Sequence, residues 1–186
     1  MNDQQGRLLR PIIAALCAGA LLCCAAGTAA EPIPSVTAGE LPRLLDQFGQ
    51  PVSATAHAGE HFVLIAVSAR RLRRIKPWEK ALREAFPDLP ILRVADLPAD
   101  SKADYERVAE KLRKRLPEDV RVGIDIGGIW AARLAVDTRS PNLLLFDPDG
   151  RLLSQWQGNY RKKRFPAVRD AITALLGDPA TPAGAD

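Results

Sequence analysis

The chain has 186 residues, of which 47% are hydrophobic and 26% are charged, with 26 basic and 22 acidic side chains. This length fits one domain of ordinary size, and the composition excludes wholesale disorder, collagen and a multi-pass membrane protein. All three cysteines lie within the first 24 residues, at Cys17, Cys23 and Cys24. The rest of the chain therefore has no thiol with which to perform chemistry.

Residues 1–30 have the pattern of a secretory signal. Arg7 and Arg10 precede an apolar run from Pro11 to Ala26, and small residues follow up to Ala30. We expect export to the periplasm, with cleavage after Ala30. The alternative is an uncleaved membrane anchor, because the apolar run approaches the length that spans a bilayer. Cleavage would leave 156 residues, 24 of them basic and 21 acidic.

The rest of the chain is predicted to alternate between strands and helices. A folded domain is expected over residues 41–177, between a proline-rich linker at 31–40 and a disordered tail at 178–186. The first predicted elements are a strand–turn–strand at 44–52, a buried strand at 61–67, a helix at 77–86 and a strand at 91–97. A second helix is expected to begin at a capping box of Ser101 and Asp104 and to end before Pro117. A strand at 120–124, a short helix at 129–134, two strands at 142–146 and 152–157 joined by a turn at 147–150, and a last helix from 165 to a C-cap at Gly177 follow. This order predicts an α/β fold with a mixed sheet.

The stretch from Val136 to Arg151 resembles the thioredoxin fold, specifically periplasmic thioredoxin-like proteins and the redoxin group. A short helix, a proline, an apolar strand, an Asp-x-x-Gly turn and a strand that ends in glycine follow one another in the family's order. Pro141 matches the family's proline, which is cis and faces the active site, and Gly158 matches the final glycine. The resemblance covers residues 44–176 and implies a three-layer sandwich, in which helices flank a central mixed sheet.

The redox motif of that family is absent at the matching position. In the family, Trp-Cys-x-x-Cys follows the first buried strand, and a helix proline lies five residues after the second cysteine. When this proline is matched to Pro77, the motif position reads Ala69, Arg70, Arg71 and Leu72. Disulfide exchange and thiol peroxidase chemistry are therefore not expected, because both need a thiolate.

Two basic clusters replace the thiols as the candidate site. The resemblance implies that the motif loop and the loop after the last strand border one groove beside Pro141. These loops have nine cations between them, which are Arg70, Arg71, Arg73, Arg74, Lys76, Arg161, Lys162, Lys163 and Arg164. The first interpretation is a non-catalytic binding or scaffold module that holds an anionic protein segment or a lipid headgroup, with Ser140 and Pro141 offering backbone for strand-like pairing. The plainer interpretation is that the charges form solvated loops.

Other functions stay open. Ser68 is a candidate nucleophile for a transferase or a degenerate redoxin, although no histidine or lysine is placed to activate it. His57 and His61 lack further ligands in the sequence, so no metal or other cofactor is expected. Nucleic acid is not an expected partner, because the basic clusters have little aromatic interleaving. A structural domain of an envelope assembly is the third alternative, and the oligomeric state is open.

Overall fold

A computed structural model describes residues 35–177 of the chain, so the expected signal at 1–30 and tail at 178–186 lie outside the described residues. The strands are β1 (Leu44–Asp46), β2 (Pro51–Val52), β3 (Phe62–Ser68), β4 (Ile91–Pro98), β5 (Gly123–Gly127), β6 (Asn142–Phe146) and β7 (Leu152–Gln157). The α-helices are α1 (Ile75–Ala85), α2 (Tyr105–Arg113), α3 (Ile129–Arg133) and α4 (Phe165–Gly177), and the 3-10 helices are η1 (Ala38–Glu40), η2 (Ala54–His57) and η3 (Ala69–Arg74). No helix within residues 35–177 is long and apolar enough to cross a membrane.

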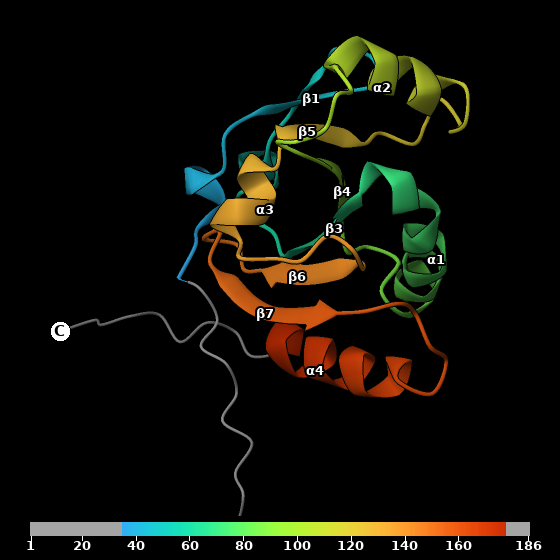
Figure 1. The fold of residues 1–186 in the computed structure, drawn as a ribbon. Coiled ribbons are helices and arrows are strands. Elements are labelled where there is room, and N and C mark those ends of the chain that lie inside the picture. The colour runs from blue at the N-terminus through green and yellow to red at the C-terminus, as the bar shows by residue number, and fades with distance from the viewer. Residues whose placement is uncertain (1–34, 178–186) are drawn as a thin grey trace, which may run out of the picture. The chain divides into compact units, whose positions relative to one another are not determined.

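The strands form one mixed sheet in the order β2-β1-β5-β4-β3-β6-β7 (Figure 1). β3, β4 and β5 are parallel, whereas β6 pairs antiparallel with β3 and β7 antiparallel with β6. β3 lies inside the sheet because Phe62 to Val67 are all apolar and all buried, as a strand covered on both faces requires. The prediction of a buried strand here is confirmed.

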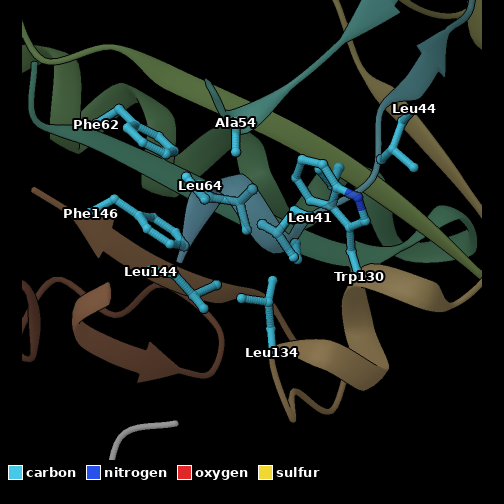
Figure 2. Packing of buried hydrophobic residues seen from close by; sticks show 12 residues of the cluster. Leu41, Leu44, Ala54, Phe62, Leu64, Trp130, Leu134, Leu144 and Phe146 are labelled. Atoms are coloured by element: carbon cyan, nitrogen blue, oxygen red, sulfur yellow. The ribbon is translucent and has the colours of Figure 1, made fainter. Parts of the chain in front are cut away.

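Helices cover both faces of the sheet, which confirms the three-layer α/β sandwich. On one face, Phe62 and Leu64 of β3 pack with Trp130 and Leu134 around α3 (Figure 2). On the other face, the alternate β3 residues Val63, Ile65 and Val67 pack against α1 and α4. α2 covers β4 and β5 through a third cluster that includes Leu97, Leu112 and Ile124.

Residues 35–40, expected to belong to a linker, pack on the domain. Thr37 forms a β-bridge with Arg151, and Ala38 is buried with its N–H donating to the Gly150 carbonyl over 2.7 Å. Gly150 has a φ of 78°, and a Cβ there would lie 3.0 Å from the Ala38 Cβ. Only glycine provides both this backbone conformation and this close approach. The folded domain therefore begins before residue 41.

α2 begins later than the capping box predicts. Its N-cap is Asp104, whose side chain accepts the Arg107 N–H over 2.8 Å. The predicted role of Ser101 was wrong, because its hydroxyl instead accepts the Ala103 N–H within the preceding loop, over 3.3 Å. The helix also ends at Arg113, one turn before the proline that was expected to stop it.

β5 starts three residues later than predicted because a side chain occupies the pairing positions of residues 120–122. Gln47 is fully buried in the turn between β1 and β2. Its Nε2 donates to the Val120 carbonyl over 2.6 Å, and its Oε1 accepts the Val122 N–H over 3.0 Å. The segment thus satisfies its buried backbone through Gln47, and backbone pairing begins only at Gly123.

Candidate functional site

The position of the absent redox motif is η3, which directly joins β3 to α1. Ala69 and Leu72 lie three residues apart, a spacing that places them on one side of a 3-10 helix. Both pack against the cluster under α2, and Leu72 also packs against the cluster under α1. This apolar pair anchors η3, and Arg70 is left exposed with Arg71 half-buried.

A cavity of about 650 Å³, here named the strand-end cavity, opens where the parallel strands β3 and β4 end. Ser68 from the end of β3, Asp96 from β4 and Thr138 from the loop before β6 supply polar lining groups, as do Asp100 and Ser101 from the loop before α2. The cations that line it come from η3, α2 and three loops, and they are Arg70, Arg71, Lys102, Lys111, Arg115 and Arg139.

A second cavity of about 980 Å³, here named the interhelix cavity, is lined by residues of η3, α1 and the end of α2. Its apolar lining residues are Leu72, Ile75, Leu112, Leu116, Pro117, Val120 and Val122. Its basic lining residues are Arg70, Arg73, Lys76, Lys80, Arg83, Arg93 and Arg115. The two cavities share a wall of four residues, Ala69, Arg70, Leu112 and Arg115.

Ion pairs neutralise only some of the cations around the interhelix cavity. Arg83 and Arg93 both pair with Glu79, and Lys80 pairs with Glu84. Burial opposes the ionisation of Glu79, but the hydrogen bonds from the two arginines outweigh it and hold the pKa of Glu79 below its ordinary value. Four lining cations form no ion pair within residues 35–177, namely Arg70, Arg73, Lys76 and Arg115.

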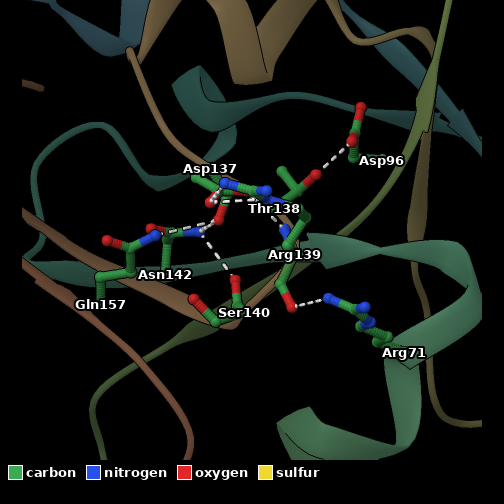
Figure 3. A network of polar contacts seen from close by, with 8 residues as sticks. All are labelled: Arg71, Asp96, Asp137, Thr138, Arg139, Ser140, Asn142 and Gln157. Atoms are coloured by element: carbon green, nitrogen blue, oxygen red, sulfur yellow. Dashed lines mark hydrogen bonds and ion pairs between the residues drawn. The ribbon is translucent and has the colours of Figure 1, made fainter.

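Asp96 is the buried acid of the strand-end cavity, with an exposed fraction of 4%. Thr138 donates its hydroxyl to Asp96 Oδ2 (Figure 3), whereas Oδ1 has no hydrogen-bond partner in the described part of the chain. Burial raises the pKa of Asp96, and the Thr138 bond offsets this only in part.

A second buried acid, Asp125, is the register partner of Asp96 on β5. Its carboxylate accepts the backbone N–H groups of Ile129, Trp130 and Ala131 at the start of α3. Burial raises the pKa of Asp125 despite these bonds, and the neighbouring Asp96 carboxyl adds to the increase. Asp125 has a structural role, since it satisfies N–H groups that the first turn of a helix leaves without partners.

The Ser140–Pro141 peptide bond is trans, as are all peptide bonds of residues 35–177. The cis bond that the resemblance implied at Pro141 is therefore not found. Asn142 is fully buried, and its Nδ2 donates to the carbonyl oxygens of Asp137 and Ser140 over 2.9 Å each (Figure 3). The Pro141 carbonyl accepts the Gly158 N–H over 2.8 Å. These bonds form with the trans isomer, which an X-Pro bond favours unless its surroundings select cis.

The predicted binding residues separate into three locations. Arg70 and Arg71 line the strand-end cavity, and Arg70, Arg73 and Lys76 line the interhelix cavity. Ser140 and Pro141 line neither cavity, and their carbonyl oxygens are already hydrogen-bonded within the chain.

Arg74 and the cluster Arg161–Arg164 also lie outside both cavities. Arg74 donates to Asn159 over 3.4 Å, and Trp78 donates to the Gly158 carbonyl over 2.9 Å, so the far end of η3 touches the loop after β7. A binding role for the cluster stays a prediction.

Sequence reasoning missed the contribution of α2 to both cavities. Lys111 and Arg115 are four residues apart, the spacing that brings side chains to one helix face, and this signal was present in the sequence. Asp96 could have been noticed as a charged residue inside a predicted buried strand.

The other candidate groups gain no catalytic partner. Within residues 35–177, the Ser68 hydroxyl forms no hydrogen bond with a histidine, lysine or carboxylate, although Ser68 lines the strand-end cavity. His57 Nδ1 lies 2.9 Å from Glu60 Oε1, and its ring stacks on Phe62. No three His, Cys, Asp or Glu side chains of the described residues lie close enough together to hold a metal ion.

Comparison of the sequence with models of known families and with curated proteins finds no match. Solved structures do match. The pneumococcal exposed lipoprotein thioredoxin Etrx1 of Streptococcus pneumoniae aligns with a TM-score of 0.56 and 15% identity, over 70% of this chain and 98% of that one. Yeast Sco1 with copper bound aligns with a TM-score of 0.55 and 14% identity, over 82% and 99%.

A secreted disulfide oxidoreductase of Mycobacterium tuberculosis aligns with a TM-score of 0.50 and 16% identity, over 70% of this chain and 95% of that one. The structural alignments establish the fold, but sequence identities this low leave the activity open. The sheet order, the layers and these alignments agree: the chain is a thioredoxin-like fold protein.

Proposed function

We propose that this chain is an exported, non-catalytic binding module that holds an acidic polypeptide segment in the interhelix cavity. The observation that carries the proposal is the combination of an apolar lining with the unpaired cations Arg70, Arg73, Lys76 and Arg115. Three of these four cations lie on η3 or at the start of α1, where the related fold has its redox motif and the helix that follows it.

The apolar lining favours a polypeptide over a lipid headgroup. A headgroup is polar and would leave the accessible parts of Leu72 and Leu116 against polar groups or water. Apolar side chains of a bound segment would each contribute about 1.5–3 kcal/mol if fully buried there. Exposed ion pairs with the rim contribute about 0.2–1 kcal/mol each, so the cations select acidic segments more than they strengthen binding.

The side chains of the site support a non-catalytic role. No cysteine occurs after Cys24, and Ser68 has no activating partner among the described residues. Export is supported by the signal-like residues 1–30 and by two similar structures, of which one is an exposed lipoprotein and the other a secreted disulfide oxidoreductase.

Fluorescence anisotropy with a labelled peptide tests the proposal on the full chain. The peptide carries alternating leucine and glutamate residues, and its matched control carries glutamine in place of glutamate. We expect the acidic peptide to bind more tightly than the control, with an affinity that falls as salt rises. The double variant Arg73→Glu/Lys76→Glu should weaken binding about tenfold or more, because four units of charge change at the rim.

The control variant Lys162→Glu/Lys163→Glu makes the same charge change outside both cavities. Equal losses in the two double variants would show attraction by net charge alone and would overturn the role of the cavity. Binding to phosphatidylglycerol vesicles without binding to the acidic peptide would replace the polypeptide with a lipid surface as the partner.

A further inference from the structure

We infer that the strand-end cavity is a separate site for a small hydroxylated oxyanion, the chemistry shared by sugar phosphates and hydroxy acids. This inference goes beyond the proposed function, because it concerns the other cavity and a small ligand. It depends on the contrast between the polar, partly acidic floor of this cavity and its cationic rim.

The floor combines hydrogen-bonding groups with the buried apolar residues Leu97, Val108 and Leu112. Ser68, Asp96 and Thr138 line it from the end of β3, from β4 and from the loop before β6. The Thr138 hydroxyl donates to Asp96 (Figure 3). The Ser68 N–H donates to the Thr138 carbonyl over 2.9 Å, so the three residues are held together. A buried carboxyl repels an anionic group and accepts from hydroxyl groups. The part of a ligand that meets this floor is therefore neutral and hydroxylated.

The rim is mostly cationic, although the exposed carboxylate Asp100 also belongs to it. Arg71 comes from η3, Lys102 from the loop before α2 and Lys111 from α2 itself. None of these three side chains forms an ion pair within the described residues. Arg71 also donates to the Arg139 carbonyl, which holds its guanidinium against the opposite loop (Figure 3). Cations from three separate elements are thus directed to one volume, where they would bind a phosphate or carboxylate.

The size and location of the cavity fit a small ligand. Its volume of about 650 Å³ lies within the range of about 300–1,000 Å³ that is usual for small-molecule sites. It opens at the carboxyl ends of the parallel strands β3 and β4, the edge at which open α/β sheets generally bind ligands. The lining of the interhelix cavity has no hydroxyl side chain, so the two cavities suit different occupants.

Isothermal titration calorimetry on the full chain tests the inference with four probes: glycerol 3-phosphate, glycerate, inorganic phosphate and glycerol. We expect glycerol 3-phosphate or glycerate to bind at least about tenfold more tightly than inorganic phosphate or glycerol, because only they engage rim and floor together. The preference between the first two distinguishes a phosphate ester from a hydroxy acid as the natural class.

Three variants assign the binding to this cavity. Arg71→Ala and Lys111→Ala should each weaken glycerol 3-phosphate or glycerate binding about tenfold, as the loss of a charged hydrogen bond does. Lys114→Ala is the matched control, because Lys114 is adjacent to α2 but outside the cavity and paired with Glu110. Asp96→Asn should raise the affinity for inorganic phosphate and so narrow the preference for hydroxylated anions. Thermal unfolding of each variant checks that it is folded.

The inference is overturned if neither glycerol 3-phosphate nor glycerate binds at millimolar concentration. It is also overturned if inorganic phosphate binds as tightly as they do, or if Lys111→Ala leaves their affinity unchanged. Failure here is distinguishable from failure of the proposed function. Arg71 and Lys111 line only the strand-end cavity, whereas Arg73 and Lys76 line only the interhelix cavity, so each pair of variants reports on one site.

Discussion

Replacement of Gln47 by methionine should destabilise the fold through backbone groups far away in the sequence. Gln47 is fully buried, and its amide satisfies the Val120 carbonyl and the Val122 N–H. Methionine has nearly the same length and shape but offers no equivalent donor or acceptor. The substitution therefore removes both hydrogen bonds with little change in packing volume.

The two lost bonds differ in cost. Val122 is 1% exposed, so its N–H would be left buried without a partner, which costs about 1–3 kcal/mol. Val120 is half-buried, so its carbonyl can turn to water, and its bond contributes about 0.5–1.5 kcal/mol. The expected loss in the free energy of unfolding is about 2–4 kcal/mol in total.

Urea denaturation followed by tryptophan fluorescence measures this loss. With an m-value of about 2 kcal/mol/M, the midpoint should fall by about 1–2 M. Gln50→Met is the control, because the Gln50 side chain is exposed, and it should change stability by less than about 0.5 kcal/mol. A loss for Gln47→Met no larger than that of the control would refute the reasoning. Val120 and Val122 also line the interhelix cavity, so acidic-peptide binding should weaken in Gln47→Met.

Three further outcomes are expected. Because burial raises the pKa of Asp96, the folded state binds its proton more tightly than the unfolded state. The contribution of Asp96 to stability should therefore fall as pH rises from about 4 through its folded pKa. In urea titrations, the free energy of unfolding of Asp96→Asn should rise relative to that of the native chain over that interval. A difference that stays constant with pH would contradict this. Gly150→Ala should lower the free energy of unfolding by about 1–2 kcal/mol through the positive φ alone. The loss should exceed that of Gly59→Ala, because Gly59 has a φ of 90° but no atom within 4 Å of the new Cβ. Equal losses in the two variants would contradict a role for the close contact with Ala38. Insulin disulfide reduction should be absent, both in the native chain and with its three cysteines replaced by serine.

Local patterns were sufficient to predict most of the elements. The run from Phe62 to Val67 has no polar residue, so only a strand buried on both faces suits it. The turn at residues 147–150 places glycine where the backbone needs a positive φ, and Gly150 has one. Such signals lie within a few residues of the structure that they predict.

The errors have a different origin. The start of β5 is displaced by Gln47, whose partner Val120 is 73 positions away, and no local pattern reports such a contact. The candidate site shows the same limit. The residues that proline matching assigned to the motif lie in η3, between β3 and α1, but the packing of α2 beside them depends on the whole sheet order. The spacing of Lys111 and Arg115 was visible in the sequence, but the cavities that they line depend on that packing.

The wall shared by the two cavities would make their occupants compete. Arg70 and Arg115 line both compartments, and two guanidinium groups cannot fully neutralise an anion on each side at once. A small anion in one compartment would then lower the affinity for an acidic segment in the other. Thermodynamic linkage requires the effect to be mutual and equal in size. The concentration of a small solute would thereby control how tightly a protein partner binds.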